Sequence, residues 1–180
     1  MPQASARLSD DNGTGWMIDG QTFRRVLGNY PTGVCAITAV AQNGEHVVMV
    51  VGTFTSVSLD PPLVGFFPDR KSSSWPKIQG AGKFCVNVLG AAHQSLCRQL
   101  ATSGPDKFTD VEFRLSGNGS PILASAIAWI DCTLEQVVET GDHYLVLGRV
   151  AEMEVVREED PMLFFRGKYG GFADLETAAP

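Results

Sequence analysis

The 180-residue sequence lacks several features that define common classes of protein. No apolar run approaches the roughly 20 residues that a membrane-spanning helix needs. No Gly-x-Gly-x-x-Gly motif opens a helix after a strand and no Walker loop is present, so the phosphate-binding motifs of doubly wound nucleotide folds are missing. A Gly-x-Ser-x-Gly elbow is also missing, which argues against a serine hydrolase. The polar N-terminus has no signal-peptide core, and we therefore expect a cytoplasmic protein.

Basic charge is scarce as well. The chain has 14 Lys and Arg against 20 Asp and Glu, a formal net charge of −6. Nucleic-acid binding needs a basic face, so this balance argues against that class. The four cysteines have no Cys-x-x-Cys spacing and apolar neighbours, which predicts buried free thiols in a reducing compartment. The three scattered histidines do not suggest a zinc site, and no metal is expected.

The remaining composition is that of one globular domain, with 44% hydrophobic residues. We expect a mobile leader over residues 1–18, the domain over 19–173 and a short tail over 174–180. A helix is predicted to begin after Asp19 as N-cap and to end at Pro31, with an apolar stripe that includes Phe23, Val26 and Leu27. Shorter helices are expected over 75–79 and 91–101.

Short strands separated by hairpin-like turns dominate the rest of the sequence. They are predicted over 34–40, 47–51, 63–67, 84–89, 130–135 and 144–155, and a strand over 163–165 is expected to close the sheet. Alternation in 130–135 predicts that Ile130 and Cys132 face one way and Asp131 and Thr133 the other. This pattern predicts a mainly β fold, an antiparallel barrel with helical decoration.

The segment from Val51 to Pro62 is the most informative part of the chain. A strongly apolar strand candidate gives way to small hydroxyl residues, and the segment ends in Pro61-Pro62, which suits neither a helix nor a central strand. Backbone N–H groups and short hydroxyls along one wall could bind a flat polar ligand. An edge strand followed by a loop is an equally good interpretation.

Two further segments carry candidate site residues. The loop 69–74 places Arg70 and Lys71 before three serines at a helix start, an arrangement that suits a phosphate group. Simple helix capping by Ser73 or Ser74 is the alternative. His143 follows Gly141-Asp142 at the root of a strand, and aromatic and cationic residues alternate over 165–169; a surface turn and an edge strand are the alternatives there.

Taken together, six segments resemble the flavin reductase family with the FMN-binding split-barrel fold, the small partner proteins of two-component flavin-dependent monooxygenases. The matching segments occur in order within residues 20–172: 23–34 (FRRVLGNYPTGV), 53–64 (TFTSVSLDPPLV), 84–89 (FCVNVL), 120–123 (SPIL), 141–143 (GDH) and 165–169 (FRGKY). The resemblance implies an antiparallel split β-barrel that forms a homodimer, with flavin in a groove near the subunit interface.

The resemblance also implies site residues. The isoalloxazine ring is expected against residues of one segment: Gly52, Thr53, Phe54, Ser56, Val57 and Ser58. A second group is expected to border the ring or line the groove wall: Asn87, Val88, Leu89, Gln94 and Phe108. The phosphate is expected at Lys71, Ser72 and Ser73. The nicotinamide nucleotide is expected at His143, Arg166 and Tyr169, with His143 positioning NADH at the catalytic centre rather than transferring an obligatory proton.

One departure from the family pattern concerns Gly52. Family members usually carry Thr-Val-Asn-Ser before the Phe, whereas this chain has Val50-Val51-Gly52-Thr53, and flavin preference or affinity could differ as a result. The implied activity is hydride transfer from NADH or NADPH to FMN or FAD, with reduced flavin supplied to a monooxygenase. A non-catalytic flavin carrier and a split-barrel oxidase of another substrate are the alternatives. The sequence does not decide between FMN and FAD or between NADH and NADPH.

Overall fold

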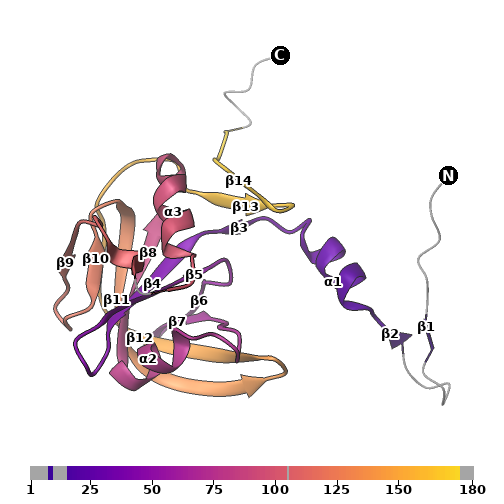
Figure 1. Ribbon diagram of the computed structural model, residues 1–180, viewed down its shortest axis with the longest axis horizontal. Coiled ribbons are helices and arrows are strands. Elements are labelled where there is room, and N and C mark those ends of the chain that lie inside the picture. Colours follow the sequence, from indigo (N-terminus) through magenta and orange to yellow (C-terminus); the bar gives the residue numbers. More distant parts are fainter. Residues whose placement is uncertain (1–7, 10–15, 105, 175–180) are drawn as a thin grey trace.

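The computed structural model describes residues 8–9, 16–104 and 106–174 as a mainly β protein with few helices and antiparallel sheets (Figure 1). Most of the predicted leader and tail lie outside the described residues. Within the leader, β1 (Leu8–Ser9) pairs with β2 (Trp16–Met17). No helix in the described part of the chain is long and apolar enough to span a membrane.

Seven strands form the main sheet, in the order β5-β4-β8-β11-β12-β7-β6 with every pairing antiparallel. They are β4 (Cys35–Val40), β5 (His46–Val51), β6 (Thr55–Leu59), β7 (Pro62–Phe66), β8 (Lys83–Leu89), β11 (Ala126–Thr140) and β12 (His143–Val155). The predicted mainly β, antiparallel architecture is confirmed. The segment 55–59 is an edge strand of this sheet, which agrees with the edge-strand interpretation of the hydroxyl-rich segment.

Besides the β1–β2 pair, two smaller sheets accompany the main one. β9 (Phe113–Leu115) pairs with β10 (Pro121–Leu123), and β13 (Leu163–Phe165) lies between β14 (Lys168–Gly170) and β3 (Thr32–Gly33). The prediction that 163–165 closes the main sheet is therefore wrong. Leu163 and Phe164 pair with Gly33 and Thr32, a contact between the two ends of the chain that no local pattern shows.

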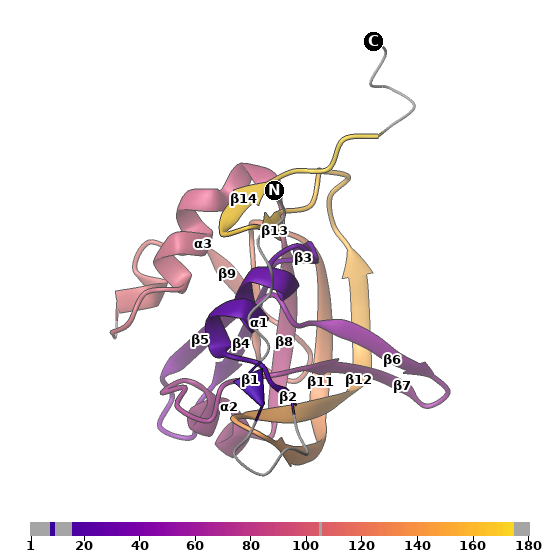
Figure 2. The same ribbon diagram turned by 90° about the vertical axis from the view of Figure 1, so that its right-hand side faces the viewer.

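The N-terminal helix α1 (Gly20–Leu27) stands away from the sheets (Figure 1) and lies in front of them in the turned view (Figure 2). Asp19 caps it as predicted: its Oδ1 accepts hydrogen bonds from the backbone N–H groups of Gln21 (2.9 Å) and Thr22 (2.8 Å). The helix ends at Leu27, earlier than predicted, and buries none of its residues.

The other helices cover the main sheet. They are α2 (Trp75–Ala81) and α3 (Gln94–Leu100), with the short 3-10 turns η1 (Ala91–His93) and η2 (Asp106–Phe108). Trp75 of α2 is buried against Phe66, whose ring also meets Phe84 edge to face at 5.4 Å. Leu100 of α3 is buried in a second cluster of apolar side chains with Leu89 and Val34. These two clusters fix the helices that border the candidate site.

The long strand β11 departs from the predicted alternation at Asp131, which is buried rather than exposed. A register shift between Asp131 and Cys132 accompanies the change. The carboxylate accepts hydrogen bonds from the Ser116 hydroxyl (2.8 Å) and the Asn118 backbone N–H (3.1 Å), while burial raises its pKa. The four cysteines are buried and free, as predicted.

Candidate functional site

The Thr53 hydroxyl joins the two hydroxyl-bearing segments. It accepts a hydrogen bond from the Phe67 N–H (3.0 Å) and donates one to the Phe67 carbonyl (3.4 Å). The end of β5 and the loop after β7 therefore lie side by side, although 14 positions separate them in the sequence.

A groove of about 510 Å³ opens along this junction. It is lined by residues 49–53, by 67–74 apart from Arg70, by 100–103 with Lys107, and by His143. Six predicted site residues come together here: Gly52, Thr53, Lys71, Ser72, Ser73 and His143. We refer to this feature as the central groove.

Backbone hydrogen bonds hold the predicted phosphate loop against the root of β12. The Arg70 N–H donates to the Asp142 carbonyl and the Tyr144 N–H donates to the Pro68 carbonyl, both at 3.0 Å. Asp69 and His143 also form an isolated antiparallel bridge. Because this framework is made of main-chain groups, Lys71 and His143 are brought to the same groove by the backbone itself.

Cationic side chains give the central groove its charge. No hydrogen bond or ion pair of the Lys71 ammonium occurs among the described residues. The Lys107 ammonium donates to the Val48 carbonyl (3.3 Å) and to the Ser74 hydroxyl (3.5 Å). Burial, and then the charge of Lys77, lower the pKa of Lys107. Two lysines beside short hydroxyls suit a phosphorylated ligand.

The serines of the loop do not behave as the capping alternative predicts. Ser72, not Ser73 or Ser74, accepts the hydrogen bond from the Trp75 N–H, at 3.2 Å. The Ser74 hydroxyl is buried and donates to the Val48 carbonyl (3.0 Å). Ser73 is exposed and lines the groove.

His143 is half-buried at the edge of the groove. Its Nδ1 lies 2.7 Å from Oδ1 of Asp142. Hydrogen bonding to His143, and then the imidazole's charge, lower the pKa of the Asp142 carboxyl below its ordinary value. The carboxylate orients the ring, so His143 is suited to positioning a ligand.

The remainder of the first predicted segment leaves the groove. Phe54 packs against the main core, and Ser56, Val57 and Ser58 lie on β6, which pairs with β7 as an edge of the sheet. Val57 covers Gly65, where a Cβ would lie 3.2 Å from its Cγ2. In a single chain these β6 residues do not line the groove.

The predicted residues on β8 face the interior. Asn87 is fully buried: its Nδ2 donates to the Thr38 hydroxyl (2.9 Å) and its Oδ1 accepts from the Leu123 N–H (2.7 Å). Leu89 is fully buried and Val88 is partly buried against the core. The Asn87 amide joins β4, β8 and β10, and none of the three residues lines the central groove.

Gln94 and Phe108 also lie outside the groove lining. Gln94 begins α3, and the Phe108 ring packs 5.6 Å from the rings of His46 and Phe113. Phe108 directly follows Lys107, so its packing anchors the segment that brings this ammonium to the groove.

Arg166 and Tyr169 lie on the β13–β14 hairpin and border a separate hollow of about 500 Å³. The Arg166 Nε donates to Oδ1 of Asn29 (2.8 Å), and the Tyr169 ring lies 5.3 Å from that of Phe164. A hydrogen bond with Cys97, and then burial, raise the pKa of Tyr169. The structure thus does not bring these residues into the central groove with His143.

Thr32 explains the departure at Gly52. A Cβ atom at position 52 would lie 2.7 Å from Oγ1 of Thr32 and 3.7 Å from the Gly33 carbonyl oxygen. Strand β3 therefore passes directly over this corner of the groove, and only glycine fits without movement of Thr32. Because Thr32 pairs with Phe164, β3 also connects the β13–β14 hairpin to the groove.

Several groove residues are not among the predicted site residues. The segment 100–103 reaches the groove from the C-terminal end of α3, Lys107 follows a few residues later, and Asp69 bridges to His143. Lys107 belongs to no motif, and only the packing of Leu100 and Phe108 brings it close. The one available signal was its positive charge in an acidic chain.

The flavin reductase like domain matches residues 27–173. A flavin reductase of Pseudomonas putida is 58% identical over 158 residues, which cover 88% of this chain and 93% of the relative. The HsaB reductase subunit of a flavin-dependent monooxygenase from Rhodococcus jostii is 46% identical over 89% of this chain and 82% of the relative.

A solved structure of the NADH:FAD oxidoreductase SgcE6 from Streptomyces globisporus, in complex with NAD and FAD fragments, superposes with a TM-score of 0.81. It is 32% identical, and the match covers 93% of this chain and 98% of that one. The resemblance predicted from the six segments is confirmed. This chain, with its groove of lysines and hydroxyls beside His143, belongs to the flavin reductase family.

Proposed function

We propose that the protein is a flavin reductase that transfers a hydride from NADH or NADPH to FMN or FAD and supplies the reduced flavin to a separate flavin-dependent monooxygenase. The observation that carries the proposal is the meeting of Thr53, Lys71, Ser73 and His143 in one groove. A groove of about 510 Å³ is of the size that holds a cofactor-sized ligand. Its lysines and hydroxyls suit the phosphate of a flavin nucleotide.

The protein's part is binding and orientation. The cofactors, when bound, supply hydride donation from the nicotinamide and acceptance by the flavin ring. Lys71 offers a charged donor to the phosphate, with the Ser73 hydroxyl beside it. The main chain at Gly52 and Thr53 borders the ring, held rigid by the bonds between Thr53 and Phe67. His143, oriented by Asp142, holds the nicotinamide nucleotide against the flavin.

The remaining predicted contacts belong to the same proposal. Ser56 and Ser58 lie beyond Thr53 on β6, outside the groove of a single chain, and we assign them to the flavin site that two copies of the chain form together. Arg166 and Tyr169 offer a cation and an aromatic ring to the nicotinamide nucleotide from the β13–β14 hairpin. This assignment of Arg166 and Tyr169 is supported by strand β3, which connects their hairpin to the groove. Thr32 of β3 lies over Gly52 and pairs with Phe164 of β13.

A homodimer is the assembly that we propose. The apolar stripe of α1 is exposed, with 55% of Phe23, 58% of Val26 and 53% of Leu27 accessible, and Leu59 at the tip of the β6–β7 hairpin is 95% exposed. Apolar surface of this kind on a projecting element is typical of an interface.

Three further assignments belong to the proposal. Residues 19–173 form the domain, and its sheets close into the split barrel that is implied by the family resemblance. The protein is placed in the cytoplasm.

The activity is tested by mixing the purified protein with NADH or NADPH and free FMN or FAD, and following the near-ultraviolet absorbance of the reduced nicotinamide. We expect oxidation that requires both flavin and protein. Flavin binding without nicotinamide oxidation would identify a flavin carrier instead. Addition of a purified flavin-dependent monooxygenase and its substrate then tests delivery, because hydroxylated product must appear only with the reductase present.

A further inference from the structure

A small hollow of about 50 Å³ adjoins the central groove. Ser73, Ser74 and Lys107 line both spaces, so the two meet at these residues. We refer to the smaller space as the side hollow. Its volume admits a few water-sized atoms, which is enough for phosphate oxygens and far too little for a nucleoside.

The Lys107 ammonium, at the junction of the two spaces, has spare binding capacity. Two of its three N–H groups donate to neutral acceptors, the Val48 carbonyl and the Ser74 hydroxyl. One N–H therefore remains for a ligand. No carboxylate pairs with this ammonium among the residues that the structure describes. A partly buried cation without a counter-ion is unfavourable, so an anionic ligand group would be stabilised beside it.

The other charged groups of the two spaces are already engaged. The Lys77 ammonium donates to both carboxylate oxygens of Glu45, at 2.6 and 2.9 Å, and these two residues line the side hollow together. In the central groove, Oδ1 of Asp69 accepts the backbone N–H of Lys71 at 2.7 Å. The ammonium groups of Lys71 and Lys107 are thus the two cations that these walls offer to a ligand.

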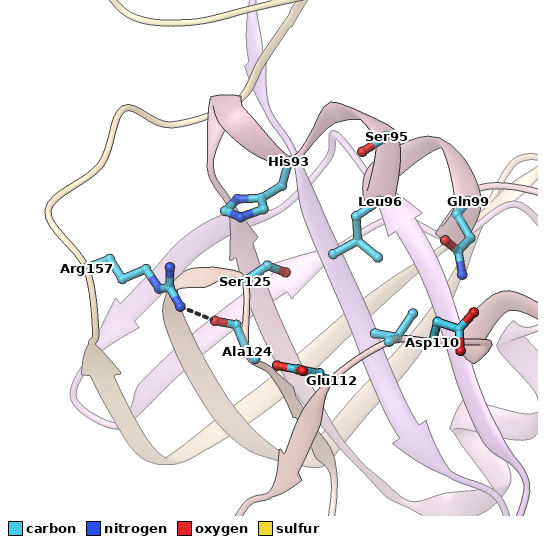
Figure 3. A pocket seen from close by; sticks show the side chains of 10 residues that line it. His93, Ser95, Leu96, Gln99, Asp110, Glu112, Ala124, Ser125 and Arg157 are labelled. Carbon is cyan, nitrogen blue, oxygen red and sulfur yellow. Dashed lines mark hydrogen bonds between the residues drawn. The ribbon is translucent and has the colours of Figure 1, made fainter.

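Helix α3 holds the segment that carries Lys107. The Gln99 side chain donates to the main-chain carbonyls of Lys107 and Thr109. Figure 3 shows the Gln99 amide pointing from α3 toward the segment that carries Asp110. The ammonium is therefore positioned by the folded chain itself, and less ordering free energy is lost when a ligand binds to it.

Ser73 lies between the two cations. Lys71 precedes it by two residues, and the Ser74 hydroxyl that follows it is contacted by Lys107 at 3.5 Å. A ligand group at Ser73 therefore has an ammonium on either side. One phosphate engages Lys71 and Ser73, whereas a second phosphate, joined to the first by a bridging oxygen, extends to Lys107.

We propose that Lys107 binds the second phosphate of FAD, where the central groove meets the side hollow, and that FAD is the preferred flavin of this protein over FMN. FMN has a single phosphate and leaves Lys107 without an anionic partner. This inference rests on the proposed function, because it takes Lys71 and Ser73 as the site of the phosphate that both flavins share.

Calorimetric titration of the full-length protein with FMN and with FAD tests the preference. We expect FAD to bind about tenfold more tightly, since one additional hydrogen bond to a charged group is made. Lys107→Gln should weaken FAD binding about tenfold and leave FMN affinity nearly unchanged, whereas Lys107→Arg, which keeps the charge, should retain most of the preference. Equal wild-type affinities for the two flavins, or equal losses for both in Lys107→Gln, would overturn the proposal.

Arg149→Gln is the matched control. Arg149 pairs with Glu135 at 2.7 Å and lines neither space, so the loss of its charge should leave both affinities unchanged. Thermal melting reports whether each variant is folded. If Lys107→Gln unfolds, the wild type still decides: inorganic diphosphate should displace FMN at about a tenth of the concentration that inorganic phosphate needs, and equal concentrations would contradict the proposal.

The nicotinamide nucleotides also contain a diphosphate, and ADP-ribose separates the two sources. It should bind the wild type and Lys107→Gln equally; a loss of its affinity in the variant would assign Lys107 to the nicotinamide nucleotide instead. Nicotinamide oxidation by the wild type is measured separately. Its absence would contradict the proposed function, whereas equal FMN and FAD affinities with oxidation intact would contradict this inference alone.

Discussion

The central groove and the projecting α1 and β6 segments differ in how completely one chain builds them. The groove walls are joined within the chain by the Thr53–Phe67 bonds and by main-chain bonds between loop 68–70 and residues 142–144. In contrast, α1 buries no residue, and Leu59 at the end of β6 is almost wholly exposed. The comparison separates a groove that one chain completes from segments that the proposed homodimer would cover.

This difference also divides the predicted site residues. Lys71, Ser73 and Thr53 are fixed by a framework that a single chain provides, so we expect the phosphate end of a flavin to be recognised there. Ser56 and Ser58 lie on the edge strand, where no described part of the chain forms an opposite wall. Substitutions in the central groove should therefore change flavin binding, whereas substitutions in the projecting segments should change dimerisation.

The largest expected effect comes from Leu27→Asp in α1. If this stripe is a dimer interface, a charge placed in it must be desolvated, and we expect the dimer dissociation constant to rise at least about 100-fold. Sedimentation velocity over a range of concentrations measures it. Gln21→Asp, at the start of the same helix, is the control and should leave the mass unchanged. A monomeric wild-type protein would contradict the prediction.

Lys71→Ala should weaken FMN binding about tenfold, since a hydrogen bond to a charged group contributes roughly 1.5–3 kcal/mol. Fluorescence titration measures it. Lys77→Ala removes the same charge from α2, where Lys77 pairs with Glu45 at 2.6 Å, and should leave FMN affinity nearly unchanged. Riboflavin, which has no phosphate, should bind the wild type and Lys71→Ala equally. A loss of riboflavin affinity in Lys71→Ala would argue against the phosphate assignment.

Gly52→Ala should lower the free energy of unfolding by roughly 1–2 kcal/mol, as expected for overpacking against Thr32. Urea denaturation measures the loss. In a Thr32→Ala background the hydroxyl that lies 2.7 Å from the added Cβ is gone, and the same Gly52→Ala change should have little effect. Equal destabilisation in both backgrounds would show that Thr32 is not the cause.

His143→Ala should have the smallest effect, raising the nicotinamide KM several-fold while the flavin dissociation constant stays the same. Steady-state kinetics with each substrate varied in turn separate the two. The variant should also return the pKa of Asp142 upward toward 3.8, because the group that lowers it is removed. NMR titration of the Asp142 carboxyl checks this, and an unchanged pKa would show that the contact does not form in solution.

Local patterns predicted much of the fold. The Asp19 cap and the strands 34–40 and 47–51, which pair as the β4–β5 hairpin, depend on neighbouring residues and were predicted from them. The pairing of β13 with β3 joins residues about 130 positions apart, so no local signal marks it. Asp131 was expected on the exposed face because strict alternation was assumed, and an irregularity in β11 breaks that alternation.

The gathering of predicted residues in the central groove could be foreseen where a segment shapes its own backbone. The loop 69–74 and His143 meet as the family resemblance implied. Asn87 was expected to border the ligand, yet its side-chain amide is hydrogen-bonded to Thr38 and Leu123 inside the protein. The sequence alone does not say which face of a strand points inward. Lys107 was not among the predicted site residues because its position depends on how α3 packs.

Helix α3 also controls the position of a cation in the central groove. Its Gln99 side chain donates to the carbonyls of Thr109 (2.7 Å) and Lys107 (3.3 Å), and thereby holds the segment that carries the Lys107 ammonium to the central groove. The position of that cation is therefore tied to the packing of α3. Thermodynamic linkage requires reciprocity: by whatever factor firmer packing of α3 raises flavin affinity, bound flavin favours the packed helix.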